Sequence, residues 1–305
     1  MARSLGAFWR VLAEVDAVWL LGPSPLTIMF ALLAALRRRT VVLGVRQDLP
    51  RYARSRHPGR RSMLVAAVLL EWMHRAVARW TSAIVVGPEL ARQYRHAVRL
   101  LTLSVSLVQA EEIVSQEVAL GRSYDDELRV LSVGRLEPEK NPLLLAEVLA
   151  RLNARDPRWR LIVCGEGPME AELRDALRVA GVEARAELRG YVPIEGGLLD
   201  LYRDSHMFLH VSWTEGLPQV LFEAFAAGLP TVATAVGGVG AAAGDSALLV
   251  PPGHADAAAR GLERLVEEEP LRRRLVISGL ERARHHTLDA ECDRVRSFIT
   301  EAAGL

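Results

Sequence analysis

The 305-residue chain has little cysteine, and it lacks an unbroken apolar run of the kind that is typical of a membrane span. Its two cysteines, Cys164 and Cys292, lie far apart without the spacing of a metal site, which fits a reducing, cytosolic setting. The most apolar window, residues 17–36, contains Gly-Pro-Ser-Pro at 22–25, and this predicts a turn between a strand and a helix. No N-terminal segment has the pattern of a secretory signal, so we expect a cytoplasmic protein without a transmembrane helix.

Two glycine-rich segments lack the residues that would complete a phosphate-binding fingerprint. Gly165 and Gly167 begin a G-x-G, but Glu170 occupies the third glycine position of the dinucleotide motif. The segment 237–244 has no Gly-Lys-Ser/Thr ending, which excludes a P-loop. The sequence therefore argues against both of these nucleotide sites.

Lysine is almost absent, since Lys140 is the only lysine among 38 basic residues. Arginine is concentrated toward the N-terminus: residues 1–125 carry 17 basic and 9 acidic side chains, and nine arginines fall within 37–61. This imbalance indicates an anionic surface or acceptor as a partner. An arginine-rich composition on a solvated surface is an equally good explanation.

Strand-like and helix-like segments alternate along the chain, which predicts parallel sheets wrapped by helices. In the first half we expect strands at 17–21, 40–45, 83–86 and about 101–108, and helices at 26–36, 61–80 and 89–94. The charged, strand-poor stretch 111–127 is expected to contain the linker between two domains. The second half repeats the alternation and ends in a predicted helix over 288–303.

Glu215 and Glu223 are the most informative pair in the sequence. They follow a strand-like run at 207–211, and Pro218 suits the first turn of a helix that begins near Leu217. Eight residues is a little over two turns, so both carboxylates are expected to converge on one ligand. The free N–H groups at the helix start favour a phosphate, and carboxylates accept hydrogen bonds from sugar hydroxyls. The pair predicts a nucleotide sugar; a capping glutamate with a solvated partner is the alternative.

The same stretch resembles the donor-binding E-x7-E element of retaining glycosyltransferases with the GT-B fold, in family 4. Upstream, GRLEPEKNP places Gly134, Arg135 and Lys140 as in that family. Further matching segments follow in the family's order at 161–168, 188–193, 231–240 and 247–253. The resemblance covers about residues 128–284.

The resemblance implies an α/β protein of the GT-B class, with two Rossmann-like parallel-sheet domains facing a cleft. Residues 1–125 would form a shortened acceptor-side domain, 126–287 the donor-binding domain, and 288–305 a helix returning to the first domain. The implied reaction moves a sugar from a nucleotide sugar, UDP- or GDP-linked, to an acceptor hydroxyl with retained configuration. No metal or other cofactor and no nucleic acid is expected. The acceptor is unknown, and a lipid-linked or an anionic molecule is possible. A peripheral contact of the protein with the inner face of the membrane is also left open.

The resemblance also assigns roles to individual residues. Arg135 and Lys140 would stabilise the departing diphosphate, Glu215 would hold the donor sugar's hydroxyls, and Glu223 would hold the ribose. The other implied donor-binding residues are Gly134, Gly165, Tyr191, Val192, Gly216, Leu217, Pro218, Gln219 and Val220.

The N-terminal part departs from the family pattern. Relatives usually run several tens of residues longer there, and they often carry a histidine after the strand at 40–45. This chain has Arg46 and Gln47 at that place, and a guanidinium donates hydrogen bonds but does not shuttle protons. His57 and His74, in a predicted loop and helix of the basic half, are weak candidates for that role, and the histidines at 206, 210, 285 and 286 are interpreted as structural or solvated. A non-catalytic or partner-dependent nucleotide-sugar-binding subunit therefore stays open as an alternative. A sugar-nucleotide epimerase of the GT-B class is a further one, although the donor motifs match transferases better.

Overall fold

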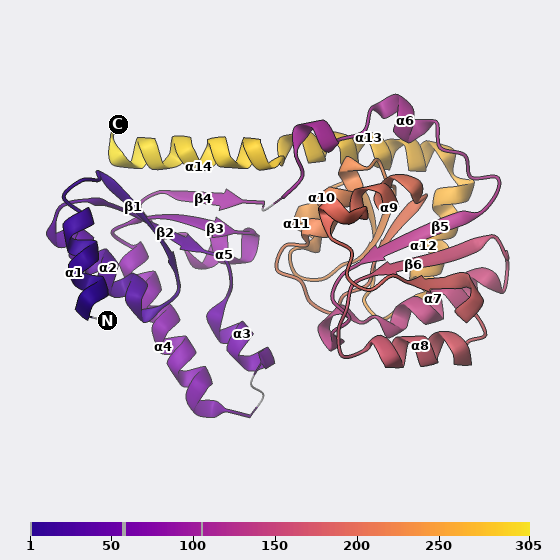
Figure 1. Cartoon of the computed structure of the whole chain (residues 1–305), viewed down its shortest axis with the longest axis horizontal. Coiled ribbons are helices and arrows are strands. Elements are labelled where there is room, and N and C mark those ends of the chain that lie inside the picture. Colours follow the sequence, from indigo (N-terminus) through magenta and orange to yellow (C-terminus); the bar gives the residue numbers. More distant parts are fainter. Residues whose placement is uncertain (1, 57–58, 105) are drawn as a thin grey trace. The chain divides into compact units, whose positions relative to one another are not determined.

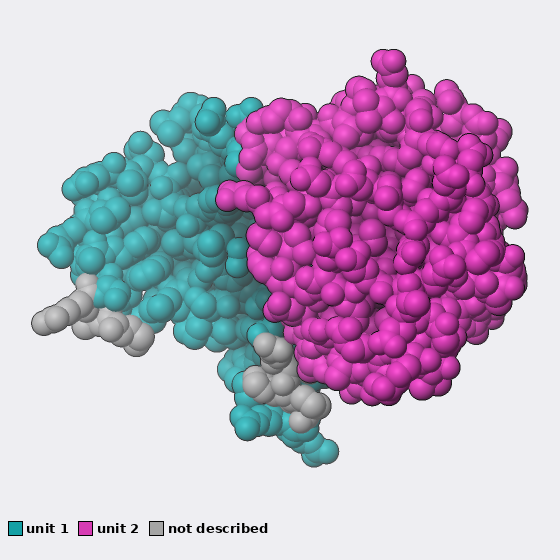
Figure 2. Space-filling model, turned by 45° about the vertical axis from the view of Figure 1, so that its right-hand side comes forward, with its two compact units in different colours: residues 1–104, 291–305 teal, residues 105–290 magenta. Residues whose placement is uncertain are grey.

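The computed structural model describes residues 2–56, 59–104 and 106–305, so His57 lies outside the described residues. The chain forms two compact units, coloured separately in Figure 2. Unit 1 comprises Met1–Ser104 together with Glu291–Leu305, and unit 2 comprises Val105–Ala290. These limits differ from the domain limits expected from sequence, because Val108 and Ala119 pack into the hydrophobic cores of unit 2.

Unit 1 is built on a parallel four-stranded sheet (Figure 1). Its strands lie in chain order: β1 (Ala17–Gly22), β2 (Thr40–Val45), β3 (Ser82–Val86) and β4 (Leu100–Leu103). Because successive side chains of a strand point to opposite faces, β2 contributes to two cores. Val41 and Leu43 pack on one face, and Val42 packs on the other.

Helices cover both faces of this sheet. The helices of unit 1 are α1 (Ala2–Val11), α2 (Pro25–Leu36), α3 (Leu49–Arg56), α4 (Arg61–Ala78), α5 (Pro88–Gln93) and the C-terminal α14 (Leu288–Ala303), of which α3 packs against α4. Helices α2, α4 and α5 supply apolar side chains to the core around Leu43, whereas Phe298 and Ile299 of α14 pack near Val42. The predicted helix at 288–303 thus has the expected bounds and lies against the sheet of unit 1.

The apolar window 17–36 forms a strand and a helix, as predicted. β1 ends at Gly22, and the side chain of Ser24 caps α2 by accepting a hydrogen bond from the backbone N–H of Thr27 at 3.1 Å. Within the described ranges, no helix has the length and apolar character needed to cross a membrane.

Unit 2 has a parallel six-stranded sheet with the order β10-β9-β8-β5-β6-β7. The strands are β5 (Leu128–Val133), β6 (Trp159–Cys164), β7 (Ala186–Leu188), β8 (Met207–His210), β9 (Thr231–Thr234) and β10 (Ala247–Val250). The chain builds outward from β5 through β6 and β7, and then crosses to β8 on the other side. The order of the strands therefore reverses between β5 and β8, which is where open α/β sheets bind ligands at their carboxyl ends.

The helices of unit 2 form two layers around this sheet (Figure 1). They are α6 (Gln116–Leu120), α7 (Leu143–Asn153), α8 (Glu170–Val179), α9 (Leu198–Asp204), α10 (Gln219–Ala226), α11 (Val239–Ala243), α12 (Ala255–Glu267) and α13 (Glu269–His285). Short 3-10 turns occur at Ala110–Glu112, Pro138–Lys140, Glu183–Arg185 and Ile194–Gly196. On β5, Leu128 and Val130 pack with α7, α8 and α12, whereas Leu131 packs with α9, α10 and α11.

Three details differ from the sequence predictions. Of the strand expected at about 101–108, β4 covers Leu100–Leu103, while residue 105 lies outside the described residues; α1 and α3 were not predicted. Helix α10 begins at Gln219 rather than near Leu217, so Pro218 immediately precedes the helix. Pro218 adopts extended backbone angles there, because residues 215–218 form a loop that leads into the helix.

Candidate functional site

A cavity of about 350 Å³ lies in unit 2, where the order of the strands reverses. Its walls come from the segments that follow β5 and β8 and from the start of α10. They include Gly134, Arg135, Lys140, His210, Ser212, Glu215, Leu217, Pro218, Gln219 and Val220. The cavity therefore occupies the position at which this topology favours ligand binding.

Glu215 is the most buried charged group of the cavity, with 7% of its surface exposed. One oxygen, Oε1, accepts hydrogen bonds from Lys140 Nζ and from Ser212 Oγ, each at 2.6 Å. His210 Nε2 lies 3.0 Å from the same oxygen, although its N–H is not aligned for a regular hydrogen bond. None of these contacts uses Oε2, which leaves a carboxylate oxygen able to accept a hydroxyl.

Glu215 is held in its charged form. Burial alone would raise its pKa, but the interaction with His210 and the charge of Lys140 outweigh burial and lower the pKa to about 2. The carboxylate is consequently ionised at neutral pH. Glu215 then accepts hydrogen bonds and donates none.

Arg135 lies at the exposed side of the cavity, with 60% of its side chain accessible. Its Nη1 donates to Glu137 Oε1 at 2.6 Å, and its Nη2 is 3.5 Å from Glu139 Oε1. The pKa of Glu139 is lowered, first by a hydrogen bond with Glu137 and then by the charges of Arg135 and Lys140. A guanidinium and an ammonium each have more N–H donors than these contacts use, so both cations retain donors for a ligand.

The start of α10 adds backbone donors. Gln219 and Val220 are the first residues of the helix, and no carbonyl of a preceding turn accepts their N–H groups. Both residues line the cavity, as do Leu217 and Pro218. The positive end of the helix dipole is therefore directed at the cavity, as in other anion sites.

Glycines keep the loops around the cavity in close contact. Gly165 has φ of +140°, and a Cβ there would lie 1.9 Å from the carbonyl oxygen of Gly134. A Cβ on Gly238 would lie 1.7 Å from the carbonyl oxygen of Gly216, and the Gly238 N–H donates to Glu215 O at 3.2 Å. Gly165 and Gly216 thus act through backbone packing, because neither lines the cavity.

Glu223 does not line the cavity that contains Glu215. Its Oε2 accepts a hydrogen bond from the hydroxyl of Tyr202 at 2.8 Å. Burial raises the pKa of Glu223; the bond from Tyr202 opposes this shift and the charge of Glu112 adds to it. Glu215 belongs to a loop, so the helical spacing that we used to relate the two positions applies only from Gln219 onward. That both glutamates bind one ligand stays a prediction.

The remaining predicted residues lie elsewhere. Tyr191 is 70% exposed and its backbone N–H donates to Glu166 Oε1, while Val192 packs against the core of unit 2. Neither lines the cavity. Arg46 and Gln47 are exposed residues that follow β2 in unit 1.

Sequence reasoning missed three residues of this region: His210, Ser212 and Tyr202. His210 ends β8 and Ser212 follows two residues later, so their place at the carboxyl end of a predicted strand was an available signal. Tyr202 offered no such signal, since its contact with Glu223 depends on how α9 packs against α10.

Comparisons with known proteins agree with this architecture. The sequence profile described as "Glycosyl transferases group 1" matches residues 117–282. The chain belongs to that family. The match lies within unit 2 and covers the cavity, including Arg135, Lys140 and Glu215.

Two curated relatives illustrate the extent of the similarity. The chain is 34% identical to D-inositol 3-phosphate glycosyltransferase of Corynebacterium efficiens over 182 residues, which is 57% of this chain and 42% of that protein. It is 33% identical to the phosphatidylinositol N-acetylglucosaminyltransferase gpi3 subunit of Schizosaccharomyces pombe over 118 residues, 39% of this chain and 26% of that one. The matches therefore span less than half of these relatives' own length.

The fold is shared with solved glycosyltransferases. The structure of Anabaena HepE in complex with UDP has a TM-score of 0.74 at 18% identity, covering 97% of this chain and 82% of that one. Sucrose-phosphate synthase from Thermosynechococcus elongatus has a TM-score of 0.69 at 20% identity, covering 98% and 77%. The expected α/β fold of the GT-B class, with two parallel sheets, is confirmed.

Proposed function

We propose that this chain is a glycosyltransferase that binds a nucleotide sugar in the cavity of unit 2 and transfers the sugar to an acceptor hydroxyl. We further propose that the anomeric configuration is retained and that no metal is required. The observation that carries the proposal is the ion pair between Lys140 and the buried Glu215, at the place where the sheet order reverses. It places a cation suited to a phosphate beside a carboxylate suited to hydroxyls.

The cavity offers electrostatic stabilisation for a departing nucleoside diphosphate. Negative charge accumulates on the diphosphate as the glycosidic bond breaks, and Lys140 and Arg135 supply positive charge at that place. The first N–H groups of α10 add to this stabilisation. Glu215 would orient the sugar by accepting its hydroxyls on Oε2.

The donor base and the acceptor need separate arguments. A UDP-sugar is supported as the donor because the solved neighbour HepE was crystallised with UDP, with a GDP-sugar as the alternative. The profile match lies in unit 2, so it carries no information about the acceptor. We place the reaction in the cytoplasm, with a lipid-linked or anionic acceptor as the working hypothesis.

A partner-dependent subunit is a second candidate. Arg46 stands where relatives often carry a histidine, and one relative is itself named a subunit of an N-acetylglucosaminyltransferase. This alternative predicts nucleotide-sugar binding without turnover until a second protein is added.

The purified chain, incubated with UDP-, GDP- and dTDP-sugars, tests the proposal. We expect slow donor hydrolysis or transfer with one of them, and loss of donor-induced thermal stabilisation in Lys140→Gln and Glu215→Gln. Arg178→Gln is the matched control, since Arg178 is an exposed residue of unit 2 that pairs with Asp175. Binding without turnover would favour the subunit, an isomerised sugar nucleotide would favour an epimerase, and equal stabilisation of all variants would reject the site.

A further inference from the structure

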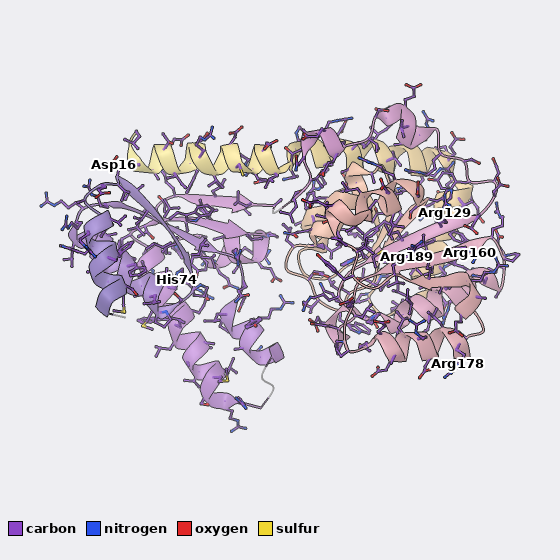
Figure 3. All side chains as sticks on the ribbon, viewed as in Figure 1. Asp16, His74, Arg129, Arg160, Arg178 and Arg189 are labelled. Atoms are coloured by element: carbon purple, nitrogen blue, oxygen red, sulfur yellow. The ribbon has the colours of Figure 1, made fainter. Side chains whose placement is uncertain are left out.

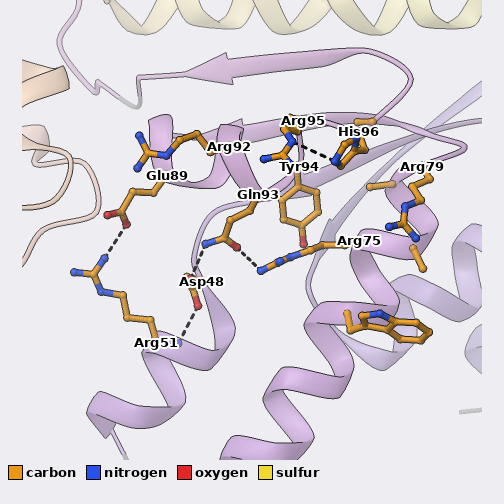
Figure 4. Close-up of a pocket in the computed structure, with 14 residues that line it drawn as sticks. Asp48, Arg51, Arg75, Arg79, Glu89, Arg92, Gln93, Tyr94, Arg95 and His96 are labelled. Carbon is orange, nitrogen blue, oxygen red and sulfur yellow. Dashed lines mark hydrogen bonds and ion pairs between the residues drawn. The ribbon is translucent and has the colours of Figure 1, made fainter.

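A second cavity, of about 650 Å³, lies entirely within unit 1 (Figure 4). It is lined by residues of α4 and α5, by the beginning of α3 and by residues 94–97. Five arginines line it: Arg51, Arg75, Arg79, Arg92 and Arg95. The only acidic residues among the lining side chains are Asp48 and Glu89.

Hydrogen bonds hold one wall of this cavity in place. Gln93 accepts from Arg75 Nη2 at 2.6 Å and donates to Asp48 Oδ2 at 2.8 Å (Figure 4). Arg75 is held from a second side by the buried Glu71, which accepts a hydrogen bond from Arg75 Nε at 3.2 Å and another from the hydroxyl of Tyr94 at 2.9 Å. The wall around Arg75 is therefore fixed before a ligand enters.

Both acidic residues of the lining are already engaged. Glu89 accepts from Arg51 Nη1 at 2.7 Å, and Asp48 accepts from the backbone N–H of Arg51 at 2.9 Å as well as from Gln93. The five lining arginines face the two lining carboxylates and the buried carboxylate of Glu71, which pairs with Arg75. The guanidinium groups therefore outnumber the carboxylates by two. The cavity has a positive excess that none of its own carboxylates neutralises.

Three of the five guanidinium groups have no carboxylate partner among the described residues: Arg79, Arg92 and Arg95, of which Arg95 donates to His96 Nε2 at 3.1 Å. Arg79 and Arg92 form no hydrogen bond or ion pair through their side chains with any other described part of the chain. Among the arginines of unit 2 labelled in Figure 3, three lie 2.6 to 2.8 Å from a carboxylate, whereas Arg129 has no ion pair among the described residues and its buried Nε has no hydrogen-bond partner. The three pairs are Arg160 with Glu127, Arg178 with Asp175, and Arg189 with Glu187. Unpaired guanidinium groups thus occur in both units, and what distinguishes Arg79 and Arg92 is that both line the same cavity.

We propose that the arginine cavity of unit 1 binds a ligand through its phosphate groups. Guanidinium groups bind phosphate oxygens through paired N–H donors, and a ligand with two phosphate charges would balance the excess. This site is additional to the donor cavity and does not depend on the proposed transferase activity. It also gives a location to the anionic partner that the arginine-rich N-terminal part predicts.

The phosphate has two possible sources, a soluble molecule or a lipid headgroup. The lipid source is worth testing because α4 carries an exposed apolar stripe, Val65, Val68, Leu69 and Trp72, and Trp72 also lines the cavity. These positions recur at the three- and four-residue spacing of one helix face. The apolar stripe on α4 therefore adjoins the arginine cavity at Trp72.

Calorimetric titration of the full chain with inorganic pyrophosphate tests the site. We compare the wild type with Arg79→Gln/Arg92→Gln, with Lys140→Gln in the donor cavity, and with Arg296→Gln. Arg296 is the matched control because its side chain is 81% exposed on α14 in unit 1 and does not line the cavity. Thermal unfolding of each variant confirms that it is folded. We expect the double substitution to weaken pyrophosphate binding by roughly tenfold or more, because each replaced arginine would otherwise form charged hydrogen bonds with the ligand. Lys140→Gln and Arg296→Gln should both still bind pyrophosphate in the cavity of unit 1.

Sedimentation with vesicles identifies the source. Phosphatidylcholine vesicles are compared with vesicles that also contain phosphatidylglycerol. Pelleting that requires phosphatidylglycerol and is lost in Arg79→Gln/Arg92→Gln supports the site with a lipid phosphate. Pyrophosphate binding that is lost in the same variant, without pelleting, supports it with a soluble ligand. The proposal is wrong if the double substitution changes neither pyrophosphate binding nor pelleting with vesicles, or if Arg296→Gln has an equal effect. Loss of pyrophosphate binding in Lys140→Gln alone would assign that binding to the donor cavity.

Discussion

Replacement of Gly238 by alanine is expected to disable the donor cavity without touching a side chain that lines it. A Cβ at this position would lie 1.7 Å from the carbonyl oxygen of Gly216, where ordinary contacts begin near 3.4 Å. Gly238 has φ of −81°, which alanine adopts without strain. The effect is therefore steric, and the contact is relieved only if the loop at 215–217 or the start of α11 moves by roughly 1.5 Å.

Such a movement would displace Glu215, because Gly238 also binds the carbonyl oxygen of Glu215 through its N–H. A misplacement on the order of 1 Å in a positioning element typically costs about 100-fold in rate, or about 3 kcal/mol of transition-state stabilisation. We expect Gly238→Ala to lower kcat/KM by that factor and to lose most donor-induced thermal stabilisation. Overpacking is expected to reduce the free energy of unfolding by about 1–3 kcal/mol. Initial-rate kinetics with the active donor and urea denaturation measure the two effects.

Gly240→Ala is the control for this substitution. Gly240 lies two residues further along in α11, and a Cβ there would meet nothing nearer than Leu249 Cδ1 at 4.0 Å. Alanine is favoured over glycine inside a helix, so this variant should be as stable as the wild type or slightly more stable. Equal donor affinity in Gly238→Ala and Gly240→Ala would refute the idea that the glycines after β9 position the Glu215 loop.

Three further predictions concern the two glutamates. Because the pKa of Glu215 is about 2 in the folded protein, against 4.5 as its ordinary value, its contribution to stability is present above pH 4.5 and is lost as the pH falls toward 2. We expect about 3 kcal/mol of acid-dependent unfolding free energy that Glu215→Gln lacks, measured by urea denaturation across that range. Tyr202→Phe should raise the pKa of Glu223 further and cost about 1–3 kcal/mol of stability, whereas Tyr191→Phe, at an exposed position, should change little. Glu223→Gln should keep the hydrogen bond from Tyr202 through its amide oxygen, and thus keep the fold. If Glu223 holds the ribose, this variant should bind the nucleotide sugar more weakly in calorimetry. Unchanged affinity would contradict that role.

Much of the fold could be predicted from the sequence because local patterns and tertiary contacts agree. The run at Thr40–Val45 is buried on both faces, and such continuous apolar runs are typical of parallel sheets. The helix at Leu288–Ala303 was predicted with its observed bounds. The start of α10 was misplaced because Pro218 suits both the first turn and the residue before it.

The candidate site could be predicted only where strand ends determine it. Lys140 and Glu215 are 75 positions apart, yet they meet because each follows one of two neighbouring parallel strands, β5 and β8. The location of Glu223 could not be predicted, since it depends on the packing of Tyr202 from another helix. Charge counting indicated an anionic partner for the N-terminal part, but only the packing of α4 against its neighbours shows which guanidinium groups are unpaired.

The two cavities differ in how their positive charges are balanced, and this difference predicts different ligands. In unit 2, Lys140 is paired with Glu215, and Arg135 is paired with Glu137 and Glu139. A simple anion would have to share these cations with carboxylates that already hold them, whereas a nucleotide sugar also brings hydroxyls for Glu215 to bind. In unit 1, Arg79 and Arg92 have no carboxylate to displace. Inorganic pyrophosphate should therefore prefer the arginine cavity, and the donor cavity should favour a ligand that combines a diphosphate with a sugar.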